Sequence, residues 1–504
     1  MGINRFIFLS ISKNFNDILI YKTCNLCIVI CTAEGYNKRQ MYIVNIHSPI
    51  FKEMLHMSKN ANANALIIGF AMFAVFFGAG NLVFPPLIGL MSGSSWEIAI
   101  IGLAISAILF PIATIIAVDN MGGTVQAICA PVAKWFTKGY MVMWIIFILT
   151  CGVPRQAGVG IESGLLSVLP GLQGNDAVRI ALLAGYFVVV LALTFRPSKI
   201  VDIVGKYLTP FLLICLVVMI ALAVFEPLGT PMAPQVDNVF SYSFLQGYQT
   251  GDVAVGIAIA GMFVASIKAK GYTDTSARHK MTLKAAVVAF LGLLIVYGGL
   301  LYLGATGSSM FDGKMDQTAL LNGLVHALTG STGNVILGIG IFLACLTTTI
   351  GVGSTIANLT VDLSDGKIPF KYMMVFVCLF GLAEACIGVQ GIIRYTFWIF
   401  IAIYPVSIAL MLLGVFCKYV PNHGAWKGTI AMATIIGLFE GLMQLNKSGI
   451  TNLPLDSLIQ LYNHIPFAAD GFAWVLPSVI GFIVGTVIVK SKGGDPYPMI
   501  SKEQ

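Results

Sequence analysis

Long apolar runs recur from residue 65 to residue 490, and they constrain the fold more than any other feature of this sequence. A helix needs about 20 apolar residues to cross a bilayer, and the chain offers twelve such runs. Only 10% of its residues are charged, whereas a soluble domain has about 25%. We therefore expect an all-α polytopic membrane protein with about twelve transmembrane helices. The expected spans are residues 65–90, 96–118, 140–168, 178–195, 204–225, 244–267, 283–304, 334–357, 371–389, 392–417, 427–445 and 472–490.

The basic residues between these spans predict which side each loop faces. If the first span begins on the cytoplasmic side, seventeen Lys and Arg residues lie in cytoplasmic loops and the C-terminal tail. Four then lie in outer loops, namely Arg179, Lys314, Arg394 and Lys447. Because cytoplasmic loops carry an excess of Lys and Arg, this division predicts an even number of spans with both termini in the cytoplasm.

Residues 1–56 differ from the rest of the chain. Their apolar runs are too short to span a bilayer. The run at Leu26–Ala33 is also too short and too far from the start to be a signal peptide. We interpret this segment as an N-terminal extension that is disordered or precedes the true start, with Met57 or Met54 as that start. Residues 57–504 then form the membrane domain.

The first span is interrupted by small and polar residues. It begins as an apolar helix, and the pattern breaks at residues 78–81 (Gly-Ala-Gly-Asn) before it resumes at Leu82. A backbone group without a partner costs several kcal/mol in a bilayer. A span is therefore broken only where the freed groups line a cavity or meet a ligand. Small residues that serve only helix packing are the alternative interpretation.

The sixth span carries a second interruption. Its sequence from Gly247 to Asp252 is polar and contains glycine. Transporters built from inverted repeats place corresponding broken spans in both halves, and span six is the partner of span one if each repeat has five spans. Two broken helices that face each other offer N–H groups to an anion and carbonyls to a cation. A free amino acid, which carries a carboxylate and an ammonium group, suits such a site.

The eighth span contains three consecutive threonines, Thr347 to Thr349, inside an apolar helix. Their neutral oxygens suit a hard cation such as sodium. Threonines that hydrogen-bond carbonyls of their own helix are the alternative interpretation. Because the first span is broken as well, we favour a cation site.

Several segments resemble those of one known family. They are FFGAGNLVFPP in the first span, GYQTGD in the sixth, ACLTTTIGVG in the eighth and the PxKIVDIVGKYLTP run at residues 197–210. Together they resemble the branched-chain amino acid:cation symporter family, the BrnQ-type carriers of bacteria, over essentially all residues from Met57 onward. The resemblance implies sodium-coupled uptake of leucine, isoleucine and valine across the cytoplasmic (inner) membrane.

The resemblance also implies a LeuT-like fold, which is a five-plus-five inverted repeat with discontinuous spans one and six and two extra C-terminal helices. Repeat one would cover about residues 65–225, repeat two about 244–417, and the extra helices about 427–490.

The same resemblance implies a set of site residues. In LeuT-type carriers the unwound part of the first span holds the substrate carboxylate, and the matching residues here are Gly78, Ala79 and Gly80. The sodium ligands implied are Ala344, Thr347 and Thr348, with the carbonyls of Ala74 and Phe77. Other substrate contacts expected near the breaks are Phe76, Phe244, Gly247, Tyr248, Thr250 and Gly251. Asn81 and Asp252 form a candidate second cation or proton site.

Charged residues inside spans are functional candidates. Asp252 is placed to hold the substrate ammonium, bind a cation or take a proton, or it only caps its helix. Arg155 and Glu162 are seven residues apart on the third span and are expected to share a helical face. We expect an ion pair that holds the bundle together, either between these two residues or with another helix, rather than contact with substrate. Glu384 and Glu440 lie away from the predicted centre, and we expect structural roles for both.

The predicted function is transport, without enzymatic activity. No Walker A sequence is present, so we expect no ATP-hydrolysing subunit. We expect no cofactor apart from sodium as the coupling ion, and as partners only branched-chain amino acids, sodium and membrane lipids, with no nucleic acid. The nearest alternative is a proton-coupled carrier of the same fold. A membrane-embedded enzyme is the other alternative, but the six histidines fall in loops or in the N-terminal extension.

Overall fold

The computed structural model describes residues 15–23, 26–33, 39–44, 61–78, 81–172, 174–195 and 213–493. The chain divides into two compact units, Met1–Ile67 and Ile68–Gln504. The strands of the first unit form an antiparallel sheet in the order β1 (Phe15–Thr23), β2 (Leu26–Ala33) and β3 (Arg39–Val44). Sequence reasoning did not find this sheet, and the position of the true start stays a prediction.

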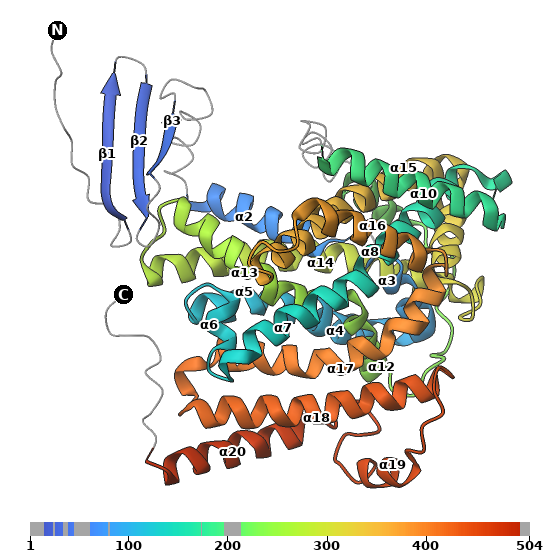
Figure 1. The fold of residues 1–504 in the computed structure, drawn as a ribbon. Coiled ribbons are helices and arrows are strands. Elements are labelled where there is room, and N and C mark those ends of the chain that lie inside the picture. Colours follow the sequence, from blue (N-terminus) through green and yellow to red (C-terminus); the bar gives the residue numbers. More distant parts are fainter. Residues whose placement is uncertain are drawn as a thin grey trace. The chain divides into compact units, whose positions relative to one another are not determined.

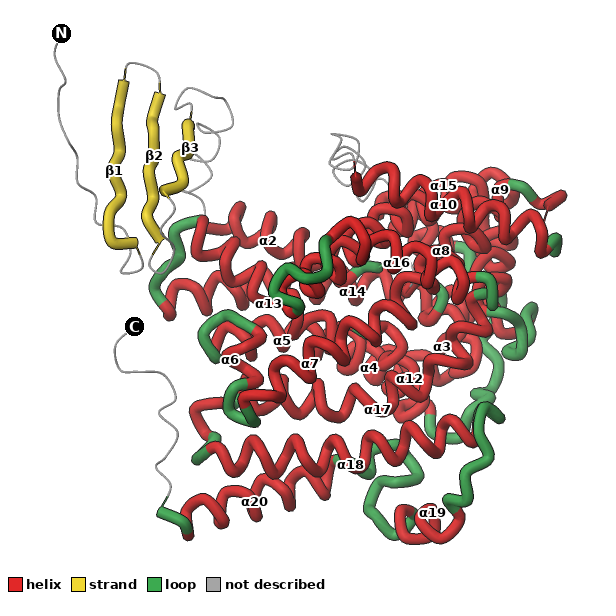
Figure 2. Tube along the Cα trace, in the orientation of Figure 1, coloured by secondary structure: helices red, strands yellow, loops and turns green. Residues whose placement is uncertain are grey.

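The second unit consists of helices joined by loops (Figure 2). The helices up to residue 225 are α2 (Ala61–Phe76, which begins in the first unit), α3 (Phe84–Ser92), α4 (Trp96–Ala104), α5 (Phe110–Asn120), α6 (Val125–Cys129), α7 (Lys134–Phe147), α8 (Val153–Val159), α9 (Leu166–Val168), α10 (Asp176–Phe195) and the helix Leu213–Phe225. The helices after it are α12 (Val239–Gly247), α13 (Asp252–Ala269), α14 (Thr275–Thr306), α15 (Gln317–Leu363), α16 (Phe370–Ala385), α17 (Val389–Val415), α18 (His423–Lys447), α19 (Asp456–Tyr462) and α20 (Val475–Ser491).

Each of the twelve expected spans falls on a helix or a group of helices. In chain order they are α2 with α3, α4 with α5, α7 to α9, α10, the helix Leu213–Phe225, α12 with α13, α14, α15, α16, α17, α18 and α20. Within the described residues, eight helical stretches are long and apolar enough to cross a membrane by themselves. The start of the expected fifth span and the run at 197–210 lie outside the described residues. The expected all-α membrane architecture is confirmed.

Helix α15 contains a bend that separates a short helix from the eighth span. Gly330 has φ +66° inside it, a conformation that glycine adopts without steric cost. Residues 317–329 therefore form a separate short helix before the span. The sequence NGLVHALTG predicts such a helix over the outer face, and the structure confirms that the helix is present.

The last three long helices, α17, α18 and α20, lie side by side (Figure 1). α18 and α20 approach closely because glycines face each other. A Cβ atom on Gly428 would lie 1.9 Å from the carbonyl oxygen of Gly481. Small residues allow this kind of close packing between transmembrane helices, and they explain how the two extra helices pack against each other.

Candidate functional site

The first span is broken where the sequence predicts. Helix α2 ends at Phe76 and α3 begins at Phe84. The freed carbonyl of Phe76 accepts hydrogen bonds from the Tyr297 hydroxyl of α14 at 3.2 Å and from the Gly78 N–H at 3.0 Å. Ala79 and Gly80 lie outside the described residues. The Phe76 carbonyl freed at this break is thus satisfied by a neutral phenol and by a local backbone bond.

The sixth span is broken at Gly247–Asp252, as the sequence predicts. Helix α12 ends at Gly247, a 3₁₀ turn η7 (Tyr248–Thr250) follows, and α13 begins at Asp252. Gly251 between them has φ +77°, which glycine adopts readily. The Gln249 carbonyl accepts a hydrogen bond from Arg155 Nη1 at 2.7 Å. A charged guanidinium therefore satisfies this second break.

A hydrogen bond between side chains joins the two breaks. Asn81 Nδ2 donates to the Asp252 carboxylate, at 3.2 Å from Oδ2 and 3.4 Å from Oδ1. The same amide lies 3.5 Å from the Tyr297 hydroxyl. Asn81 and Asp252 are 3% and 6% exposed. These two residues, predicted as one site, do lie together.

Both breaks line one small cavity of about 70 Å³. Its volume is on the order of five water molecules, at about 10–15 Å³ for each. Its walls come from the first, third, sixth, eighth and tenth spans: Val75, Gly78, Asn81, Phe147, Ile148, Cys151, Gly152, Val153, Arg155, Gln156, Thr250, Gly251, Asp252, Val255, Thr348, Thr349, Val352 and Phe400. A charged or polar region at the breaks thus adjoins an apolar region of aromatic and branched side chains.

The predicted sodium ligands are only partly gathered at this cavity. Thr348 lines it, whereas Ala74 and Phe77 do not. The hydroxyls of Thr347 and Thr348 both donate to the Ala344 carbonyl, at 3.0 and 2.9 Å. This is the bonding within one helix that the alternative interpretation describes. It does not exclude a cation, because a hydroxyl that donates one bond keeps its lone pairs.

The predicted substrate contacts separate into two groups. Thr250 and Gly251 line the small cavity. Phe76, Phe244, Gly247 and Tyr248 do not. Tyr248 instead stacks on Tyr404 with ring centroids 4.4 Å apart. This contact holds the 3₁₀ turn of the second break against α17.

The ion pair expected of Arg155 and Glu162 is confirmed in part. Glu162 forms an interhelical ion pair with Arg179 of α10 at 3.7 Å and accepts a hydrogen bond from Thr318. Arg155 bonds to the second break instead, and the expected shared helical face is wrong. The physical reason is a π-helical stretch, η5 (Gly160–Leu165), which includes Glu162. Because a π turn holds more residues than an α turn, a spacing of seven does not keep the two on one face.

The other two carboxylates inside spans lie apart from this cavity. Glu440 accepts a hydrogen bond from the Tyr462 hydroxyl of α19 at 2.7 Å. Neither Glu440 nor Glu384 lines the cavity between the breaks. The positions agree with the structural roles expected for both.

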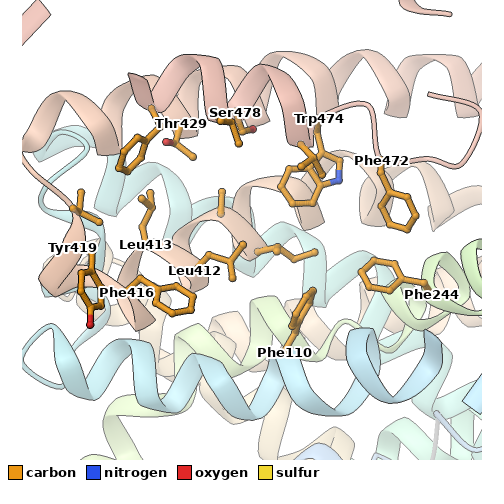
Figure 3. A pocket seen from close by; sticks show the side chains of 16 residues that line it. Phe110, Phe244, Leu412, Leu413, Phe416, Tyr419, Thr429, Phe472, Trp474 and Ser478 are labelled. Carbon is orange, nitrogen blue, oxygen red and sulfur yellow. The ribbon is translucent and has the colours of Figure 1, made fainter. Parts of the chain in front are cut away.

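A second and larger cavity of about 500 Å³ lies beside α17, α18 and α20 (Figure 3). Phe244 and Phe110 point into it from one side and Trp474 from the other. None of its lining residues is charged. It is therefore unsuited to a zwitterion. The smaller cavity is the candidate substrate site because both helix breaks line it.

Several residues at the breaks and the small cavity carried no sequence motif. Phe147, Gln156 and Phe400 line the cavity, and Tyr297 bonds to the first break. A tyrosine or glutamine in an apolar span is a weak signal, since such residues also serve ordinary helix packing. Only their contacts with the breaks distinguish them.

Comparisons with known proteins agree with this geometry. The chain is 32% identical over 435 residues to the branched-chain amino acid permease BraB of Bacillus subtilis, which covers 84% of this chain and 95% of that protein. It is 30% identical over 436 residues to the permease BrnQ of Haemophilus influenzae, covering 84% and 97%. These relatives are permeases, so the chain is a transporter and not an enzyme.

Solved structures show the fold. An inward-facing structure of Mhp1 matches with a TM-score of 0.56 at 14% identity, over 88% of this chain and 92% of that one. A structure of MhsT in complex with L-phenylalanine matches with a TM-score of 0.51 at 14% identity, over 83% and 98%. The family model described as branched-chain amino acid transport protein matches residues 61–492. The chain therefore belongs to the branched-chain amino acid transport protein family.

Proposed function

We propose that this protein is a sodium-coupled symporter that imports leucine, isoleucine and valine across the bacterial cytoplasmic membrane by alternating access. One observation carries the proposal. Both helix breaks and two threonines of α15, Thr348 and Thr349, line a single cavity. Broken spans that meet at a central site are the arrangement by which inverted-repeat transporters bind a substrate and a coupling ion.

The walls of the cavity fit a branched aliphatic side chain. Phe147, Ile148, Val255, Val352 and Phe400 form its apolar part. Such a pocket separates ligands that differ by one methylene by only about 1–3 kcal/mol. We therefore expect leucine, isoleucine and valine to compete with one another, in keeping with the names of the permeases that resemble this chain.

The donor set near the first break supports sodium as the coupling ion. Sodium prefers oxygen ligands, by extension of the preference of other hard cations. Thr348 Oγ1 and the Ala344 carbonyl lie together on α15, and Thr348 reaches the cavity beside Val75 and Gly78. The carbonyls of Ala74 and Phe77 remain proposed ligands, and a second cation or a proton at Asn81 and Asp252 remains the alternative.

We further propose that both termini lie in the cytoplasm. The seventeen-to-four division of basic residues between the two sides supports this orientation. No ATP-hydrolysing partner is proposed, because the sodium gradient supplies the driving force.

Uptake by the purified full chain in proteoliposomes tests the function. An inward sodium gradient at equal pH on both sides is expected to drive accumulation of labelled leucine. Unlabelled isoleucine and valine are expected to suppress that uptake. Replacing the sodium gradient with a potassium gradient is the control. Accumulation driven by a pH gradient but not by sodium would replace the proposal with the proton-coupled alternative.

A further inference from the structure

Arg155 is a buried cation without an acidic partner. It lies on α8, is 4% exposed, and donates Nη1 to the Gln249 carbonyl. Its guanidinium also lies over the rings of Phe84 and Phe400, at 5.1 and 5.5 Å from their centroids. No ion pair among the described residues includes it, and its Nε has no hydrogen-bond partner among them. A buried charged side chain without an ion-pair partner inside a membrane protein is a candidate for contact with a substrate or an ion.

Asp252 is the corresponding anion. It is 6% exposed, and its carboxylate accepts hydrogen bonds from the neutral amide of Asn81. Among the described residues it too forms no ion pair. Arg155 and Asp252 both line the cavity between the breaks. This cavity therefore has one positive and one negative group on its walls, and neither is neutralised by the other at ion-pair distance.

Three backbone N–H groups among the described residues of the breaks already have acceptors. The N–H of Gly78 donates to the Phe76 carbonyl at 3.0 Å, and the N–H of Gly251 donates to the Tyr248 carbonyl at 3.0 Å. The N–H of Asp252 lies 3.4 Å from Thr250 Oγ1. These three N–H groups have acceptors, whereas the buried Nε of Arg155 has none among the described residues.

We propose that Arg155 binds the carboxylate of the amino acid and that Asp252, held by Asn81, binds its ammonium group. The assignment rests on the proposed function and deepens it. A planar guanidinium matches a carboxylate better than any other side chain does. The zwitterion then neutralises both walls, and its side chain extends toward Phe147, Val255 and Phe400. Arg155 also holds the Gln249 carbonyl, so substrate binding reaches the second break directly.

Substrate analogues distinguish this role from a structural one. Leucinamide keeps the ammonium and the side chain of leucine but lacks the carboxylate. We expect the wild-type protein to bind leucine at least ~100-fold more tightly than leucinamide, because a site built for a polar group strongly rejects a ligand without it. In Arg155→Gln this ratio is expected to fall to about tenfold or less, with leucine binding weakened and leucinamide binding little changed.

The matched control is Arg394→Gln. Arg394 also donates to a backbone carbonyl, that of Ser448 at 2.8 Å, but it is exposed and does not line the cavity. Its variant is expected to keep the wild-type ratio. If Arg155→Gln weakens leucine and leucinamide equally, Arg155 only clamps the second break and the assignment is overturned.

The reciprocal variant keeps the proposal testable if Arg155→Gln does not fold. In Asp252→Asn, the preference for leucine over 4-methylpentanoate, which lacks the ammonium group, is expected to fall at least ~10-fold. An unchanged preference would overturn the assignment of Asp252. A wild-type protein that binds none of leucine, isoleucine and valine would overturn the proposed function itself. Ligand preferences measured in the two variants test only the assignment of Arg155 and Asp252.

Discussion

The two helix breaks solve the same problem with different chemistry. Each frees a backbone carbonyl inside the membrane, and each carbonyl is satisfied by a side chain of another span. At the first break, Tyr297 donates to Phe76; at the second, Arg155 donates to Gln249. A phenol adds no charge, whereas a guanidinium adds a full positive charge that needs an anion. We therefore propose a cation at the first break and the zwitterion at the second.

The link between the breaks gives the largest expected effect. Asn81→Ala removes the amide that donates to Asp252, which leaves a buried carboxylate without this partner. Losing a hydrogen bond to a charged group costs about 1.5–3 kcal/mol. We expect the affinity for leucine to fall by ~10- to 100-fold, measured by equilibrium binding to the purified protein.

Asn120→Ala is the control for that variant. Asn120 also bridges two helices, donating to the Gly414 carbonyl at 3.2 Å, but away from the cavity. We expect it to lower thermal stability without changing the leucine affinity. Equal losses of affinity in both variants would mean that Asn81 only stabilises the bundle.

Glycine substitutions compare the backbone of the two breaks. Gly251 has φ +77°, and an added Cβ would lie 3.1 Å from the Phe147 ring. A left-handed conformation costs other residues about 1–2 kcal/mol. An added Cβ on Gly78 would lie 3.2 Å from the Gln156 side-chain amide and 3.7 Å from that of Asn81. We expect Gly251→Ala to reduce leucine uptake about tenfold and Gly78→Ala to reduce it less than threefold.

The reverse order in this pair of variants would contradict the comparison. It would mean that the first break makes the closer approach to the substrate. Uptake is measured over the initial linear phase, with protein content in the vesicles matched by quantitative immunoblot.

The hydroxyl at the first break has a smaller expected effect. Tyr297→Phe removes one of the two donors to the Phe76 carbonyl, and the Gly78 N–H remains. A neutral hydrogen bond contributes about 1 kcal/mol, so we expect the transition temperature of the protein to fall by a few degrees and uptake to fall ~5-fold.

Tyr140→Phe is the control for Tyr297→Phe. Its hydroxyl bonds to Ser407 at 3.1 Å, far in sequence from either break. We expect a similar loss of stability with normal uptake. Normal uptake by Tyr297→Phe would show that the first break tolerates the loss of its cap.

Both breaks could be predicted from local sequence. Glycine and polar residues are rare inside an apolar span, and they can be recognised without knowledge of tertiary contacts. The spans followed from hydropathy for the same reason. The partners of the breaks could not be predicted this way. Arg155 meets Gln249, which lies 94 residues later in the chain, and Tyr297 is 221 residues from Phe76. Such contacts depend on how helices pack, and helical periodicity itself failed at the third span because of its π-helical stretch.

Thr348 gives the smallest expected effect, and it tests the cation side of the comparison. If the first break and α15 hold sodium, Thr348→Ala should raise the sodium concentration for half-maximal leucine uptake about threefold, with little change in the maximal rate. The control is Thr360→Ala on the same helix, whose hydroxyl donates to the Ile356 carbonyl at 2.9 Å as Thr348 donates to Ala344 at 2.9 Å. Both variants lose the same local bond, so only a cation at Thr348 separates their sodium dependence.

Identical sodium dependence in the two variants would mean that the threonines only donate hydrogen bonds within their helix. The coupling ion would then be assigned to Asn81 and Asp252, and the substrate and the ion would both bind where the two breaks meet.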